Sequence, residues 1–77
     1  MIIELFKIGR NGKYNFWRKI NTNYTHSNQN IPQVHDAFDY VTKNGNTEKF
    51  IVMRIEWIWY AKQKYMAVQL MLERPSK

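Results

Sequence analysis

The strongest constraint in this sequence is a run of alternating apolar residues towards its C-terminal end. Every odd position from 51 to 59 is apolar, and every even position from 66 to 72 is apolar. A period of two is typical of a β-strand with one buried face. Because the parity switches between the runs, only a loop of even length puts both apolar sets on one face. The sequence therefore predicts an antiparallel hairpin with strands over residues 48–60 and 64–73.

A two-residue loop at Lys62-Gln63 satisfies this parity and pairs Trp59 with Met66. The same register gives the pairs Trp57–Val68, Ile55–Leu70 and Met53–Leu72. Lys62-Gln63 lacks the glycine or asparagine that tight hairpin turns favour, so a four-residue loop is the alternative. Trp57 and Trp59 lie on the apolar face, and we expect them in the core, packed under a helix.

A second hairpin is predicted from strands at residues 2–8 and 14–20. Asn11-Gly12 between them is a strong hairpin signal, because a type I′ turn needs positive φ at both central residues. An aromatic pair and a pair of opposite charges support the resulting register. Its pairs are Phe6–Trp17, Glu4–Lys19 and Ile3–Ile20. The pattern does not show which face of this hairpin is the core.

Residues 31–43 are predicted to form a helix. Asn30 can cap it, Pro32 suits its first turn, and Gly45 can end it in the left-handed conformation. Its apolar residues follow helical spacing along one stripe. They are Ile31, Val34, Phe38 and Val41. The polar residues 21–30 before it are predicted to be a loop.

These elements predict a single α+β domain over residues 1–77. Its order is ββαββ, a two-layer arrangement in which one helix packs on one face of a four-stranded antiparallel sheet. Strand 14–20 at a sheet edge could pair with a copy of itself, which would give a homodimer.

Basic residues exceed acidic ones, with twelve Lys and Arg against six Asp and Glu and a net charge of +6. This balance favours nucleic acid or an acidic protein as partner, although small domains also carry net charges of about 2–8 for solubility. Tyrosines on a sheet face can stack bases and lysines can bind phosphates, but both are also common there for structural reasons. The candidate binding residues are Arg10, Lys13, Arg18, Lys19, Arg54, Tyr60, Lys62, Lys64 and Tyr65.

Catalytic and metal-binding signals are scarce. The chain has no cysteine, no phosphate-binding loop and no metal-binding helix motif. His35 and Asp39 would share a helix face, but no further ligand has suitable spacing, so we interpret them as a surface hydrogen-bonded pair. We expect no enzymatic activity, no metal and no cofactor. One catalytic alternative is a small endoribonuclease toxin that uses His26 or His35.

No apolar stretch approaches about 18 residues, so no membrane span is predicted. The first nine residues lack the features of a secretory signal. The absence of cysteine fits a reducing compartment. We expect a cytoplasmic protein, located in the host cytoplasm if a phage encodes it.

Residues 52–61, VMRIEWIWYA, resemble part of a small phage-encoded anti-CRISPR protein family, the type I-F inhibitors. The resemblance lies in Val52-Met53-Arg54-Ile55-Glu56 and in the aromatic-rich return that follows through a tight turn. It implies no catalysis, no cofactor and binding to a Cas protein–RNA complex so that target DNA cannot pair. It assigns no individual contact residue.

The first functional hypothesis is a small basic inhibitor from a phage or mobile element. It would block a host nucleoprotein complex by steric and electrostatic occlusion. Arg54, Tyr60 and Tyr65 would anchor it, because Arg and Tyr dominate interface hot spots. The alternative hypothesis is direct binding of DNA or RNA by a basic, aromatic sheet face.

Overall fold

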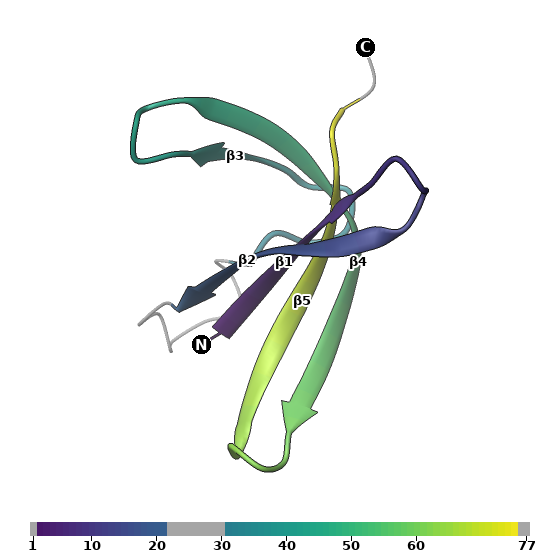
Figure 1. The fold of residues 1–77 in the computed structure, drawn as a ribbon, viewed down its shortest axis with the longest axis vertical. Helices are drawn as coiled ribbons and strands as arrows, with labels where there is room; N and C mark the ends of the chain where they lie inside the picture. Colours follow the sequence, from purple (N-terminus) through teal and green to yellow (C-terminus); the bar gives the residue numbers. More distant parts are fainter. Residues whose placement is uncertain (1, 22–30, 76–77) are drawn as a thin grey trace.

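The computed structural model describes residues 2–21 and 31–75, which form one five-stranded sheet and contain no helix (Figure 1). The strands are β1 (Ile2–Ile8), β2 (Tyr14–Asn21), β3 (Ala37–Val41), β4 (Thr47–Tyr60) and β5 (Tyr65–Glu73). Their order across the sheet is β2-β1-β5-β4-β3. All neighbours are antiparallel except β1 and β5, which run parallel. The predicted α+β class, with a helix on a four-stranded antiparallel sheet, is therefore wrong.

The segment predicted as a helix, residues 31–43, contains a turn and strand β3. Phe38 and Tyr40 are half-buried while the residues between and beside them are exposed, which is the period of two of a strand. In the sequence, a segment as short as residues 37–41 is compatible with the period of a helix and with that of a strand. Gly45 has the predicted positive φ, 87°, but in the turn between β3 and β4.

Backbone hydrogen bonds to β4 explain why this segment is extended. The His35 amide donates to the Val52 carbonyl over 2.7 Å, and the Val52 amide donates to the Asp36 carbonyl over 3.0 Å. The φ of His35 is 75°, which no right-handed helix accommodates. The long strand β4 offers an edge for pairing, and satisfying its backbone groups outweighs a weak local helical preference. Asn30, the predicted helix cap, lies in residues 22–30 outside the described residues.

The N-terminal hairpin has the predicted strands but only part of the predicted register. The pairs Ile3–Ile20 and Glu4–Lys19 are confirmed. A β-bulge after Leu5 then shifts the pairing, so that Phe6 faces Phe16 in place of Trp17. The two phenylalanine rings meet edge to face with centroids 5.7 Å apart. The bulge also turns the Trp17 side chain towards the core.

The turn of this hairpin differs from the predicted type I′ turn. The Gly9 amide donates to the Lys13 carbonyl over 2.8 Å, which leaves a three-residue loop, 10–12. Only the last residue of that loop, Gly12, has positive φ, at 76°. A three-residue hairpin loop places its glycine at this left-handed position.

The C-terminal hairpin has the predicted strands and the alternative, four-residue loop. The pairs Trp59–Met66, Trp57–Val68 and Ile55–Leu70 are confirmed. Residues 61–64 form the turn, which closes through a 2.7 Å hydrogen bond from the Lys64 amide to the Tyr60 carbonyl. Lys64 has the φ of 60° that this closure requires.

A second β-bulge lies at Met53 of β4. Val52 pairs with Leu72 and Arg54 pairs with Met71, so the predicted pair Met53–Leu72 is wrong. An extra residue in one strand reverses the faces to which later residues point. Phe50 and Val52 are therefore buried on the face that Ile55 occupies beyond the bulge.

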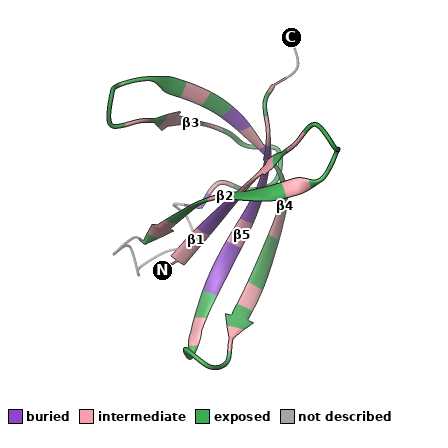
Figure 2. Ribbon diagram, in the orientation of Figure 1, coloured by how far each residue is buried: buried purple, intermediate pink, exposed green. Residues whose placement is uncertain are grey.

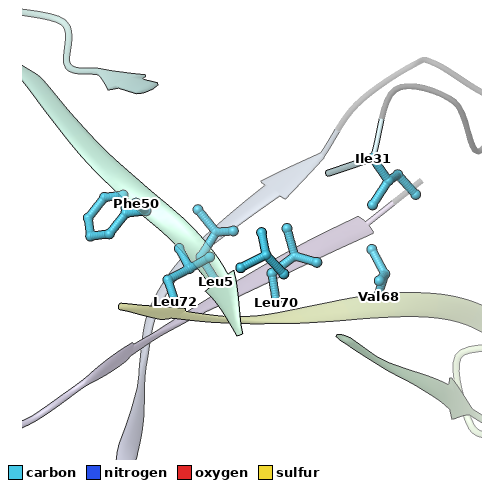
Figure 3. Close-up of a cluster of buried hydrophobic side chains, with 7 residues drawn as sticks. Leu5, Ile31, Phe50, Val68, Leu70 and Leu72 are labelled. Atoms are coloured by element: carbon cyan, nitrogen blue, oxygen red, sulfur yellow. The ribbon is translucent and has the colours of Figure 1, made fainter. Parts of the chain in front are cut away.

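The core lies on the concave face of the curled sheet, with β5 at its centre (Figures 2 and 3). Ile31 covers it from the segment before β3. The sheet supplies the other buried members, and a fully buried aliphatic or aromatic side chain contributes about 1.5–3 kcal/mol. These members are Leu5, Phe50, Val52, Val68, Leu70 and Leu72.

The curl brings the two edge strands of the sheet together. Trp17 of β2 and Tyr40 of β3 belong to opposite ends of the strand order, yet their ring centroids are 4.9 Å apart. Trp17 also packs against Phe50, at 5.2 Å between centroids. The Arg18 guanidinium lies 5.4 Å from the centre of the Tyr40 ring. Side-chain packing thus closes the half-barrel at the edges where backbone pairing ends.

Trp57 and Trp59 are not in the core, contrary to the prediction, since 51% and 55% of their surface is exposed. The reason is that the β4–β5 hairpin extends beyond its neighbours (Figure 1). Among the described residues, β3 pairs with β4 only as far as Ile51, and β1 pairs with β5 from Ala67 onwards. No described strand or helix covers the apolar face of the outer hairpin.

The closure of the half-barrel gives a matched pair of substitutions. Trp17→Ala removes the contacts between β2, β3 and β4, and we expect it to lower the free energy of unfolding by about 2–3 kcal/mol. Trp57→Ala removes the same chemical group from an exposed site and should cost less than about 1 kcal/mol. Urea denaturation of both variants measures the difference. Equal losses would contradict the role assigned to Trp17.

Candidate functional site

The outer end of the β4–β5 hairpin is the candidate site. One face carries Trp57, Trp59 and Met66, with exposed fractions of 51%, 55% and 48%. Met66 is the cross-strand partner of Trp59, so these three side chains form a continuous surface, called here the tryptophan patch. Lys62 and Lys64 lie in the turn next to it, both exposed (Figure 2). The site therefore combines aromatic surface with positive charge.

The opposite face of the hairpin is occupied by a hydrogen-bonded network. Tyr60 and Tyr65 pair across the strands with centroids 5.0 Å apart. The Tyr60 hydroxyl lies 2.9 Å from each carboxylate oxygen of Glu4, and the Gln69 side-chain amide donates to the same carboxylate over 2.9 Å. Glu4 is only 7% exposed. Tyr60 thus satisfies a buried carboxylate, which is a structural role.

This network changes the ionisation of Tyr60. Its hydrogen bond to Glu4, with burial and the negative charge of Glu4 as further causes, raises the pKa of Tyr60 above its ordinary value of 10.0. A second pair on this side of the sheet behaves alike: the hydrogen bond to Glu73 raises the pKa of Tyr14. Neither tyrosine is activated as a base or nucleophile at neutral pH.

Each of the six carboxylates has a partner within the described residues. Three of them pair with cations, over 3.3 Å for Asp39–Lys49, 3.1 Å for Glu56–Arg54 and 3.2 Å for Glu48–Arg74. The other three, Glu4, Glu73 and Asp36, accept hydrogen bonds from neutral donors. Most cations in the described part of the chain therefore have no carboxylate partner, and the positive surplus faces solvent.

The predicted binding residues divide between two ends of the sheet. Lys62 and Lys64 lie at one tip, with Tyr60, Tyr65 and Lys19 close by, since the Lys19 ammonium is 5.9 Å from the Tyr65 ring centre. Arg10 and Lys13 lie at the other end (Figure 1), because β1 runs parallel to β5 and ends beside Leu72. The two basic tips do not converge.

The two remaining arginines are held by neighbours. Arg18 lies 5.0 Å from the centre of the Trp17 ring, next to the closure between β2 and β3. Arg54 pairs with Glu56 on the same strand. Neither of them contacts the tryptophan patch residues by an ion pair or cation–π contact in the described structure.

The tryptophan patch was missed because its alternation predicts a buried face. The signal that would have revealed it is strand length. The predicted strand over 48–60 is longer than the other predicted strands, and in the described structure β3, its neighbour on the other side, has only 5 residues. A strand end without a neighbour exposes whichever apolar residues it carries.

No group of three or more His, Cys, Asp or Glu side chains in the described residues is arranged for a metal ion. Asp39 pairs with Lys49 in β3 and β4, and the helix that would have placed it beside His35 is absent from the described structure. His26, the other histidine, lies outside the described residues. None of the described segments is a helix that could cross a membrane.

No family model, curated protein or solved structure matches this chain. The resemblance of residues 52–61 to the type I-F inhibitors therefore stays a prediction.

The Tyr60–Glu4 hydrogen bond predicts a titration with a defined sign. Because folding raises the pKa of Tyr60, the neutral hydroxyl contributes stability below about pH 10, and this contribution is lost as pH rises through the folded pKa. In Glu4→Gln the Tyr60 pKa should fall towards 10.0. Ring-carbon NMR shifts of labelled tyrosine measure it. Tyr14, whose partner is Glu73, is the internal control and should not move; an unchanged Tyr60 would contradict the assignment.

Proposed function

We propose that the protein binds single-stranded nucleic acid through the outer end of the β4–β5 hairpin. The observation that carries the proposal is the exposure of Trp57 and Trp59 beside two lysines that have no carboxylate partner in the described structure. Stacking of a base on an aromatic side chain contributes about 1–3 kcal/mol and works with any base.

The spacing of the tryptophans favours an unpaired strand over a duplex. Side chains two residues apart on a β-strand are separated by about 6.6 Å along it. Each indole can therefore meet a separate base, provided that the bases are unstacked from one another. Bases in a duplex have their faces covered by neighbouring pairs, whereas single strands present them.

The charge distribution supports the same partner. Lys62 and Lys64 stand at the hairpin tip, within reach of phosphates that flank a base on the patch. The net charge of +6 steers polyanions towards the protein as a whole.

A second candidate function is the occlusion of a host nucleoprotein complex, as in the inhibitor hypothesis. Met66 favours it, because Met and Trp are enriched at protein interfaces and Met66 widens the patch beyond what base stacking uses. In this second proposal, Arg54 and Tyr60 no longer serve as the anchoring residues, because Arg54 is paired with Glu56 and Tyr60 with Glu4. The tryptophan patch would take their place.

Single substitutions on the patch test the first proposal. We expect Trp57→Ala and Trp59→Ala each to weaken binding of a fluorescent single-stranded oligonucleotide by about 1–3 kcal/mol, measured by anisotropy at low salt. Phe16→Ala is the matched control, because Phe16 is 58% exposed on β2 and lies outside the patch. Equal weakening by all three variants would contradict the site.

Charge removal at the tip tests the role of the lysines. Lys62→Gln combined with Lys64→Asn should reduce the slope of log K against log salt by up to about 1.4, which corresponds to two phosphate contacts on a single strand. Asparagine is chosen at position 64 because it tolerates the positive φ found there.

The control removes two charges from the β3–β4 hairpin, Lys43→Gln with Lys49→Gln, and should leave most of the slope intact. A protein partner is distinguished by a pull-down from host lysate with and without nuclease. Retention of one defined complex after nuclease, with no oligonucleotide binding by the isolated protein, would reject the first proposal and favour the second.

A further inference from the structure

A cleft of about 550 Å³ lies at the end of the sheet opposite the tryptophan patch. It is bounded by the end of β1, the β1–β2 turn and the chain that follows β5. Three cationic side chains line it: Lys7 and Arg10, which are close in sequence, and Arg74, which lies near the other end of the chain. Only the parallel pairing of β1 with β5 brings these segments together.

Lys7 is held in this cleft without a negative partner. Its ammonium lies 4.2 Å from the centre of the Trp17 ring and 5.8 Å from that of Phe50. No carboxylate within the described residues forms an ion pair with it. The Lys7 residue is half-buried against these rings, and aromatic faces attract a cation without neutralising its charge. An anion in the cleft would therefore be attracted more strongly than by a fully exposed lysine.

The two arginines are available to an anion. Arg10 is exposed in the turn. Arg74 pairs with Glu48 over 3.2 Å, and 74% of its side chain is exposed. Surface ion pairs of this kind contribute about 0–1 kcal/mol, so a stronger acceptor can compete for the guanidinium. The fork of donors on arginine matches the oxygens of a phosphate.

One carboxylate, Glu73, lines the cleft as well. It accepts a hydrogen bond from the Tyr14 hydroxyl, so one of its acceptor positions is already occupied. The three cations, with Glu73 in the lining and Glu48 paired to Arg74, leave a net positive charge of about +1 around the cleft. A phosphate monoester carries about −1.5 to −2 at pH 7, which this charge complements.

We infer that this cleft is a phosphate-binding site, formed by Lys7, Arg10 and Arg74, that takes a dianionic phosphate group. The inference does not rest on the proposed function, because its residues are separate from the tryptophan patch and lie at the other end of the sheet. The phosphate can belong to a small molecule or to the end of a nucleic-acid strand, and the two sources share the same recognition chemistry.

Titration with inorganic phosphate tests the site. We expect saturable amide NMR shifts near Lys7, Arg10 and Arg74 at constant ionic strength, with chloride as the balancing anion. Arg10→Gln combined with Arg74→Gln should weaken phosphate binding at least tenfold. The variant Lys43→Gln with Lys49→Gln, on the β3–β4 hairpin, is the matched control and should bind phosphate normally.

Lys7→Met keeps the apolar stem against Trp17, removes the charge and should also weaken binding. If Lys7→Met does not fold, phosphate binding by the Arg10→Gln, Arg74→Gln variant tests the inference, because both arginines are exposed. Equal shifts with chloride alone, shifts spread over all basic residues, or unchanged binding by the double arginine variant would overturn the inference.

Oligonucleotides with and without a terminal phosphate separate the two sources. Tighter binding of the phosphorylated strand that depends on Arg10 and Arg74 assigns the site to strand ends. Saturation by inorganic phosphate, with no preference between the two strands, assigns it to small phosphates. Loss of oligonucleotide binding in the Trp57 and Trp59 variants with intact phosphate binding would show that the two sites are independent.

Discussion

The contact between Trp17 and Tyr40 is the constraint on which the rest of this structure depends. It joins the two outermost strands of a five-stranded sheet, which backbone pairing leaves unconnected in the described residues. A chain of 77 residues buries little more than about 60% of its unfolded surface. An open sheet alone would therefore leave much of the sheet's apolar face exposed to water. Curling the edges over Phe50 encloses that face without a second layer. The bulge that turns Trp17 inwards makes the contact possible.

The second bulge, at Met53, divides β4 into a part that faces the core and a part that extends beyond it. Before it, Phe50 and Val52 face the core, while beyond it the same face carries Ile55 and then the two tryptophans. One continuous apolar face thus passes from buried to exposed along a single strand. The change occurs where neighbouring strands end, so burial follows the number of neighbours and not the hydrophobicity of the residue.

The parallel pair β1–β5 places two basic regions at opposite ends of the sheet. One tip carries the tryptophan patch with Lys62 and Lys64, and the other end carries a basic cleft. Cationic side chains outnumber carboxylates in both regions. On the convex side, the buried carboxylate of Glu4 ties β1 to the C-terminal hairpin through Tyr60, which makes this tyrosine part of the scaffold.

The sequence alone determined four strands and most of their registers, because alternation, turn glycines and cross-strand pairs act over short distances. It also determined the basic balance and the hairpin tip with its two lysines. Only the tertiary structure decided that residues 37–41 pair as a fifth strand, that β1 lies parallel to β5, and that the tryptophans are exposed. Alternation shows that a strand has an apolar face. That face is buried only where another segment packs against it or extends the sheet beside it, and these segments come from distant parts of the chain. The cleft depends on the same long-range pairing, since only the β1–β5 pair brings Arg74 beside Lys7 and Arg10.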